Sequence, residues 1–245
     1  MDVVNQQQAQ ARYFNFRLGF GIPIGIMLMM LFADPTRLDF FLTRQFYSPE
    51  TGFVGHHSYW LENILHERAK QVLIALALLA VIGFGTSLFV EGFAKWRRPL
   101  GYIVLTLGLC TGLVSPLKEA TAIHCPWSLS DFGGMETYST LLGPRATTDS
   151  PGKCWPGGHA SAGFSLLCLF FALRDKRPRA ARYALALALG LGSLFSLGRM
   201  MQGAHFLSHN LWTLLIDWVV CLATYRWIIY RPQGARRNIE PAVPA

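Results

Sequence analysis

The sequence predicts an all-α protein, a single bundle of six transmembrane helices. Apolar residues make up 52% of its 245 residues, and Asp, Glu, Lys and Arg only 15%, against about 25% in a soluble domain. Two uncharged runs, Val72–Val90 and Leu100–Leu117, approach the roughly 20 apolar residues that a helix needs to cross a bilayer. The basic residues also gather on one side of the membrane once the apolar runs are threaded through it.

Four shorter apolar runs complete the predicted bundle. They are Leu18–Ala33, Ala160–Leu173, Tyr183–Gly198 and Leu211–Tyr225. Each alone could be a buried helix of a soluble protein, but six such runs leave too little polar surface to cover one core. The first run could be a signal peptide. Because Asp34-Pro35 follows it instead of a small-residue cleavage site, we expect a retained span.

Lys and Arg set the predicted orientation. With the N-terminus in the cytoplasm, 14 of the 22 basic residues but only four of the 14 acidic ones fall on the cytoplasmic side. Both termini are therefore expected in the cytoplasm. The net charge of +8 then reflects membrane topology and requires no nucleic-acid partner. The compact layout is typical of a bacterial inner (cytoplasmic) membrane protein.

This topology divides the chain into one membrane domain, residues 1–230, and a disordered basic cytoplasmic tail, residues 231–245. Residues 34–70 and 118–158 are the two long segments expected on the periplasmic side. An apolar helical face in the first of them either lies on the outer membrane surface or packs against the bundle. That face comprises Tyr59, Trp60, Leu61, Ile64 and Leu65.

The unusual polar residues of the chain converge at one depth of the predicted bundle. All of them fall at the outer ends of helices: Lys118, His159, Arg199, His205 and His209. Gly157 and Gly158 precede a predicted helix, where backbone N–H groups can approach an anion. Two cations suit phosphate oxygens, and a histidine can attack phosphorus while another protonates the leaving oxygen. These residues predict a phosphate site at the periplasmic face.

Three motifs in register resemble those of the type 2 phosphatidic acid phosphatase superfamily (PAP2), which is related to vanadium haloperoxidases. Lys118, six residues and Cys125-Pro126 match the first motif, Lys, six residues, Arg-Pro. Pro156-Gly157-Gly158-His159 matches Pro-Ser-Gly-His. Gly198-Arg199, five residues, His205, three residues and His209 match Ser-Arg, five residues, His, three residues, Asp. The resemblance covers residues 118–209 and the six-helix layout.

The resemblance implies a membrane lipid phosphatase that acts on a lipid phosphomonoester or diphosphate without a metal ion or other cofactor. His205 would form a phosphohistidine, and His159 would protonate the leaving group. Lys118, Arg199 and the backbone of Gly157 and Gly158 would hold the phosphoryl oxygens. Family substrates include phosphatidic acid, phosphatidylglycerol phosphate, undecaprenyl diphosphate and lipid A phosphates, and the residues do not choose among them.

Two departures from the family pattern affect the expected chemistry. Cys125 replaces a phosphate-binding arginine, and His209 replaces the aspartate that would orient the nucleophile. On a continuous helix His209 would share a face with His205 and could accept its Nδ1 proton. Asp217 lies about 18 Å further along such a helix and cannot substitute. Gly157 and Gly198 also replace family serines, which removes two hydroxyl groups.

The cysteines suggest a disulfide beside the site. Cys125 and Cys154 are the only cysteines of the outer segments, and the periplasm is oxidising. A bond between them would tie the Lys118 segment to the Pro-Gly-Gly-His turn, and Lys153 could supply the missing positive charge. Cys110, Cys168 and Cys221 fall inside spans and are expected to pack as small apolar residues.

Three other functions remain open at this stage. The same site could serve a lipid phosphotransferase, or a non-catalytic protein that binds or transports lipid phosphates. His205 and His209, with His124 and His159, could instead ligate the metal of a membrane oxidase. Lys118 and Arg199 argue against the metal site, because cations repel a metal ion.

Overall fold

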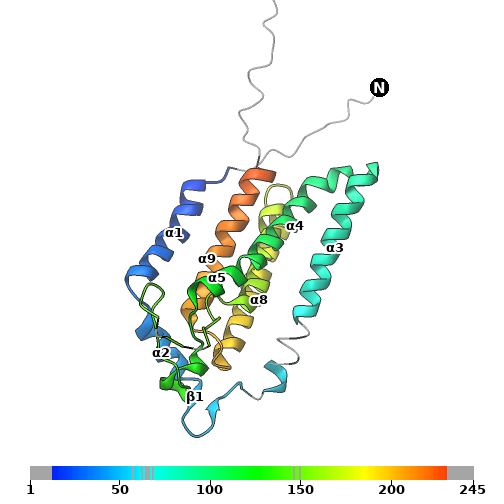
Figure 1. The fold of residues 1–245 in the computed structure, drawn as a ribbon. Helices are drawn as coiled ribbons and strands as arrows, with labels where there is room; N and C mark the ends of the chain where they lie inside the picture. The colour runs from blue at the N-terminus through cyan, green and yellow to red at the C-terminus, as the bar shows by residue number, and fades with distance from the viewer. Residues whose placement is uncertain are drawn as a thin grey trace, which may run out of the picture.

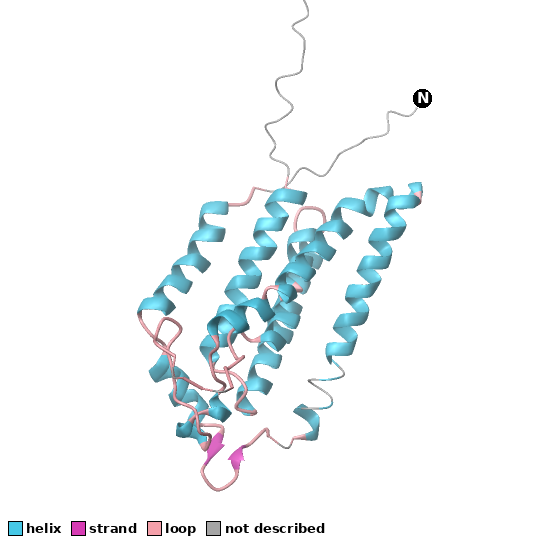
Figure 2. Cartoon of the chain, viewed as in Figure 1, coloured by secondary structure: helices cyan, strands magenta, loops and turns pink. Residues whose placement is uncertain are grey.

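The structure is a computed structural model that describes residues 13–56, 58–61, 63, 67, 69–145, 147–148 and 150–230. The chain is mostly helical, and its long helices lie side by side (Figures 1 and 2). The short helix α2 and a small hairpin lie at one end of the bundle, the lower end in Figure 1. The predicted tail, residues 231–245, lies outside the described residues, as do Ile64 and Leu65 of the predicted surface helix.

The first two helices form a bent pair. The side chain of Asn15 caps α1 (Phe16–Phe32) by accepting a hydrogen bond from the N–H of Leu18, 3.2 Å away. The chain turns at Asp34, whose side chain accepts from the N–H of Thr36, and continues as α2 (Thr36–Arg44) at 85° to α1. Because α2 leaves the direction of the bundle, its residues lie against the outer loops.

The middle of the chain forms a hairpin and two long helices. Strands β1 (Tyr47–Ser48) and β2 (Gly52–Phe53) pair in antiparallel fashion. The following helix, α3 (Ala69–Phe89), packs mainly on α4 (Arg97–Gly112) and leaves most of its apolar side chains exposed. The 3₁₀ turn Glu91–Trp96 joins α3 to α4. After α4 the chain continues as α5 (Val114–Thr121), which carries Lys118.

The C-terminal half supplies the centre of the bundle. Two 3₁₀ turns, Pro126–Ser128 and Ser130–Phe132, precede α6 (Gly158–Phe164), α7 (Leu167–Leu173), α8 (Pro178–Met201) and α9 (Leu207–Thr224), which ends in a π-helical turn, Tyr225–Ile229. Helix α9 contacts α1, α4, α6 and α7, and α8 packs on α6 and α7. The core between them contains Tyr102, Phe171 and Leu222, all fully buried.

All six predicted runs are helical, but six spans are not established. Within the described residues, four helical stretches are long and apolar enough to cross a membrane: Gln71–Phe89, Glu91–Ser128, Pro178–Met201 and Leu207–Ile229. The bent pair α1–α2 would make a fifth. The run Ala160–Leu173 falls in Gly158–Leu173, which is shorter than these four stretches and divides into α6 and α7.

An outer layer covers one end of the bundle. Its core is an aromatic and aliphatic cluster of Phe53, Leu129, Phe132 and Phe206, with Phe40 and Tyr138 packed against it. These residues come from α2, the hairpin, the loop after α5 and the turn before α9, so the cluster joins segments that are distant in sequence. Arg145 binds the same layer together by donating to the backbone oxygens of Thr121, Thr140 and Leu141.

Candidate active site

The Pro-Gly-Gly-His turn is anchored to the start of α9. Gly157 precedes α6 in an extended conformation, and His159 is the second residue of that helix. The N–H of Gly157 donates to the backbone oxygen of His209, 3.3 Å away. The carbonyl of Gly157 accepts from Oγ1 of Thr213, 3.2 Å away. The Gly157 N–H is thus engaged within the protein, in contrast to its predicted role of holding a phosphoryl oxygen.

The two glycines of this turn allow close approach of polar side chains. A Cβ atom on Gly157 would lie 2.4 Å from Oδ1 of Asn210, a contact that real side chains do not make. A Cβ on Gly158 would lie 3.6 Å from the Nζ atom of Lys118. The absence of a side chain at Gly157 therefore lets α9 pack against the turn, whereas the distance at Gly158 is an ordinary van der Waals contact. Asn210 also explains why this chain has glycine where the family motif has serine.

His205 lies in the turn between α8 and α9 and not on a helix, so the expectation that it shares a helical face with His209 is wrong. Helix α9 begins only at Leu207, because Phe206 is extended, with ψ 161°. Two residues before His205, Gly203 has φ +72°, and a Cβ there would lie 2.4 Å from the ring of Phe53. This glycine permits the tight reversal after α8 that places His205 beside the other site residues.

The predicted site residues come together around His205. Burial and four neighbouring groups lower the pKa of the buried His205 imidazole well below its ordinary value of 6.5. Burial contributes most, and the groups follow in the order His209, Lys118, Arg199 and His159. Geometry agrees with this grouping, because His159 and Arg199 line one cavity and the Nζ atom of Lys118 lies 3.6 Å from the Cβ position of Gly158, the residue before His159. A neutral imidazole is the form that has a lone pair for attack on phosphorus.

His209 does not orient His205 through a direct hydrogen bond. Their ring centres are 6.0 Å apart, and among the described residues neither Nδ1 atom has a hydrogen-bond partner. The His209 ring bonds instead to the backbone of Cys154. The predicted acceptance of the His205 Nδ1 proton by His209 is therefore absent. Asp217 does not orient His205 either, because it accepts a hydrogen bond from Ser161 inside the bundle.

Arg199, in the last turn of α8, is held from two directions. Its Nη1 donates to Oε1 of Gln202 at 2.8 Å, and its guanidinium carbon lies 5.6 Å from the ring centre of Trp127. Stacking and a side-chain acceptor restrict the guanidinium fork to one orientation. Lys118 is close enough to Arg199 for the two positive charges to repel each other. An anion between them would relieve this repulsion.

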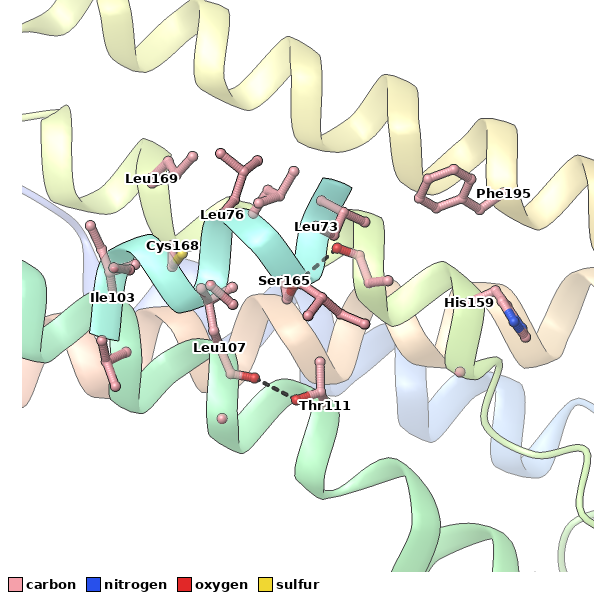
Figure 3. Close-up of a pocket in the computed structure, with 18 of the residues that line it drawn as sticks. Leu73, Leu76, Ile103, Leu107, Thr111, His159, Ser165, Cys168, Leu169 and Phe195 are labelled. Carbon is pink, nitrogen blue, oxygen red and sulfur yellow. Dashed lines mark hydrogen bonds between the residues drawn. The ribbon is translucent and has the colours of Figure 1, made fainter. Parts of the chain in front are cut away.

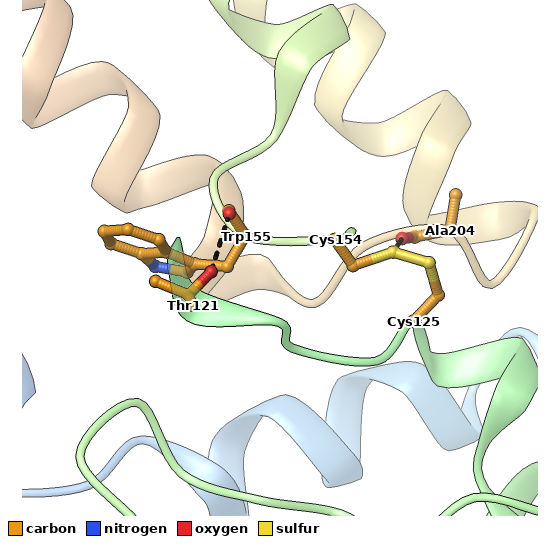
Figure 4. Close-up of a disulfide and its surroundings, with 5 residues drawn as sticks. All are labelled: Thr121, Cys125, Cys154, Trp155 and Ala204. Carbon is orange, nitrogen blue, oxygen red and sulfur yellow. Dashed lines mark hydrogen bonds between the residues drawn. A yellow bond between two sulfur atoms is a disulfide. The ribbon is translucent and has the colours of Figure 1, made fainter. Parts of the chain in front are cut away.

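The disulfide lies directly beside the His205 turn (Figure 4). Cys125 and Cys154 are bonded, with Cα atoms 5.1 Å apart. A sulfur atom of Cys154 contacts the backbone oxygen of Ala204 at 3.2 Å, and the Cys154 N–H donates to the Ile123 carbonyl. The bond thus joins the loop after α5 to the turn that carries His205. Lys153 is exposed and is not one of the charges that act on His205.

The fourth histidine of the metal hypothesis is engaged elsewhere. The Nε2 atom of His124 lies 3.5 Å from Oε2 of Glu136. Within the described part of the chain, no group of three or more His, Cys, Asp or Glu side chains is arranged to hold a metal ion. Among those residues, His124, His159, His205 and His209 thus do not form the ligand group that the metal hypothesis expects.

A largely apolar cavity of about 780 Å³ lies in the bundle, and two of the predicted site residues, His159 and Arg199, line it. His159 lies at one end, and Ile103 and Leu169 lie toward the other (Figure 3). Its polar end also includes Gly158, Arg199 and Gln202. Apolar side chains of α3, α4, α7 and α8 form the remaining wall, so the cavity combines an anion-binding end with a long hydrocarbon-lined end.

Comparison with known families gives one match. The family model of the PAP2 superfamily matches residues 99–233. The chain belongs to the PAP2 superfamily. Membership indicates phosphatase-type activity. No curated protein and no solved structure matches the chain. The match covers all PAP2 motifs discussed above but leaves out α1, α2 and α3.

Sequence reasoning missed four residues that shape this PAP2 site. They are Asn210 and Thr213 on α9, Gln202 after α8, and Asp39 on α2, all buried. Asn210 and Thr213 are polar residues within about one helical turn of His209. Their closeness to a motif residue could have identified them from the sequence. Asp39 lies far from every motif, and only its contact with Ser208, at 2.9 Å, relates it to the site.

Replacing Gly157 by the family serine should destabilise this protein. The new Cβ atom would overlap Oδ1 of Asn210 in a packed region, and overpacking costs about 1–3 kcal/mol. We expect Gly157→Ser to lower the midpoint of thermal unfolding in detergent, and the added change Asn210→Ala to recover part of the loss. Gly190→Ser, at an exposed helical site with no neighbour within 4 Å of its Cβ, is the control. A Gly157→Ser midpoint equal to that of the control would contradict the overlap.

Loss of the disulfide should destabilise the outer layer. The two cysteines are 29 residues apart, a loop for which cross-linking contributes about 3–4 kcal/mol by chain entropy. We expect Cys125→Ser/Cys154→Ser to unfold at a lower temperature than the native protein. The control is Cys110→Ser/Cys168→Ser, which changes two free buried thiols. Dithiothreitol should lower its unfolding temperature by as much as it lowers that of the native protein. A native protein whose unfolding is insensitive to dithiothreitol would oppose this expectation.

His205 should titrate below pH 6.5. The protonated ring is disfavoured by burial and by the positive charges around it, so the neutral form should persist into the acidic range. The measurement is a nuclear magnetic resonance titration of histidine Cε1 signals in micelles, with His205→Gln used for assignment. We expect Lys118→Met to raise the midpoint, because it removes one positive charge. A His205 midpoint at or above 6.5 would show that the described cluster is wrong.

Proposed function

We propose that this chain is a membrane lipid phosphatase that hydrolyses a lipid phosphomonoester or diphosphate through a phosphohistidine on His205. The proposal depends on one observation above all. The histidine at the family's nucleophile position is within electrostatic reach of two cations and two further histidines, and two members of this cluster, His159 and Arg199, line an apolar cavity. The cluster suits a phosphate group and the cavity suits a hydrocarbon chain.

In the first step, neutral His205 attacks phosphorus. A P–N bond forms while the P–O bond to the lipid breaks, and His159 donates a proton to the departing oxygen. Lys118 and Arg199 stabilise the negative charge on the equatorial oxygens of the transition state. Both residues are close enough to His205 to act on its charge, which suits this role.

In the second step, water replaces the lipid alcohol or phosphate. His159, now neutral, accepts a proton as the water oxygen attacks phosphorus, the P–N bond breaks, and inorganic phosphate leaves. Side chains of the chain fill every role in both steps, so we propose that the reaction proceeds without a metal ion. Transfer to a second lipid instead of water would use the same phosphohistidine and is an outcome of the test below.

The cavity supports a lipid as the substrate. Its volume of about 780 Å³ lies within the range of about 300–1,000 Å³ typical of sites for small molecules. Apolar side chains from four helices line it, and His159 and Arg199 lie at its polar end. Because α3 packs mainly on α4, its remaining apolar surface can face lipid, and a substrate can reach the cavity from the bilayer.

We further propose six spans, cytoplasmic termini and a site that faces the periplasm of a bacterial inner membrane. The short segment Gly158–Leu173 and the bent pair α1–α2 would serve as the two spans that fall short of a simple transmembrane helix. The distribution of Lys and Arg supports this orientation. A disulfide in contact with the His205 turn agrees with an oxidising compartment.

The decisive experiment is phosphate release from a panel of lipids by purified protein in detergent. The panel contains phosphatidic acid, phosphatidylglycerol phosphate, undecaprenyl diphosphate and lipid A carrying a phosphate, each with and without EDTA. We expect release from at least one lipid, undiminished by EDTA, and a loss of at least about a thousandfold in His205→Ala. Water-soluble short-chain analogues should be poorer substrates, because they leave the apolar cavity empty.

The matched control is His124→Ala, which removes a histidine paired with Glu136 away from the cluster. It should retain native activity. Activity abolished by EDTA would contradict the metal-free mechanism, and phosphorus recovered on a second lipid would indicate a transferase. Lipid binding without turnover by the native protein, unchanged in His205→Ala, would indicate a non-catalytic binding protein.

A further inference from the structure

Asp39 is a buried carboxylate outside the region that matches the family. It lies on α2, is only 2% exposed, and precedes the matched residues 99–233 by 60 positions. Among the described residues no Lys or Arg forms an ion pair with it. A buried carboxylate without a cation is costly unless hydrogen bonds satisfy it. Its hydrogen-bond partners therefore indicate why it is retained.

Both carboxylate oxygens of Asp39 bind one residue of α9. Oδ1 accepts from the N–H of Ser208 at 2.9 Å, and Oδ2 accepts from its Oγ. Ser208 is the second residue of α9, where backbone N–H groups have no partner within the helix. Asp39 thus acts as a helix cap supplied from another helix, and its negative charge is favoured by the positive end of the α9 dipole.

The neighbouring residue of α2 holds the same turn by aromatic contact. The ring of Phe40 stacks on that of Phe206, with centres 5.5 Å apart and planes 15° apart. Phe206 is fully buried and follows His205 directly. Two successive residues of α2 therefore hold positions 206 and 208, one on each side of Leu207.

These contacts matter because, among the described residues, no hydrogen bond to Nδ1 orients the His205 ring. Its Nδ1 has no hydrogen-bond partner among the described residues, and the family aspartate that would orient it is replaced by His209. The position of the ring then depends on the backbone of the turn from 205 to 208. In a reaction of this kind, a displacement of about 1 Å can cost 100-fold in rate.

We propose that Asp39 is a positioning residue for the reaction at His205. By holding the first turn of α9 through Ser208, it fixes the backbone from which the imidazole reaches phosphorus. This inference rests on the proposed function. In the family pattern, the aspartate of the third motif would orient the nucleophile, and this chain has His209 there. We assign part of that orienting role to Asp39 on α2.

The test compares Asp39→Ala, Asp39→Asn and Ser208→Ala in phosphate release, with thermal unfolding measured on each variant. We expect Asp39→Ala to lower kcat by about 10- to 100-fold while KM changes less than about threefold, because Lys118, Arg199 and the cavity are untouched. Asp39→Asn keeps an oxygen for the Ser208 N–H and should retain more activity. Ser208→Ala keeps its backbone N–H and should lose least.

Asp131→Ala, which removes an exposed carboxyl group of the outer layer, is the matched control and should behave as native. A native kcat in folded Asp39→Ala would overturn the proposal. So would a loss of kcat in all three variants that merely follows the folded fraction. If Asp39→Ala does not fold, the test uses the kcat values of the other variants. The proposal then requires kcat to fall in the order native, Ser208→Ala, Asp39→Asn.

A second measurement separates this proposal from the proposed function. The His205 Cε1 resonance should shift or broaden in Asp39→Asn and in Ser208→Ala, while the His124 resonance stays in place. If the native protein releases no phosphate from any lipid, the proposed function fails and the resonance still reports on the positioning. An unchanged His205 signal in both variants would overturn the role of Asp39.

Discussion

The structure depends on holding two buried imidazoles, His205 and His209, beside the half-buried Lys118, His159 and Arg199 at one end of an apolar bundle. Lys118, Arg199, His159 and His209 all act on His205, and Lys118 and Arg199 repel each other. Such a cluster is unfavourable in a medium of low dielectric constant unless an anion joins it. Because Lys118 and Arg199 repel each other, an anion placed near both would lower the electrostatic energy of the cluster.

The outer layer connects the segments that carry this cluster. Asp39 and Phe40 hold the start of α9, the Cys125–Cys154 disulfide contacts Ala204, and Gly157 bonds to His209. Each contact connects a different segment to the turn that carries His205. The layer thus constrains the backbone around His205, in a chain where His209 and Cys125 stand in place of the family aspartate and arginine.

Much of the site could be predicted from sequence because its chemistry lies in short motifs. Lys118, His159, Arg199 and His205 were selected from residue type, spacing and position at helix ends, and the structure brings them together. Spacing could not tell that α9 begins after His205, because that boundary depends on the extended Phe206 and the positive φ of Gly203. The expected hydrogen bond between His205 and His209 failed for the same reason.

By itself, the sequence determined the membrane class and the family motifs, since these follow from hydropathy and from the spacing of a few residue types. Tertiary structure alone decided that the segment from 158 to 173 divides into two helices, that His209 bonds to the backbone of Cys154, and that Asp39 reaches Ser208 across 169 residues. Such contacts depend on how distant segments pack, and no local pattern in the chain encodes which buried polar groups will meet.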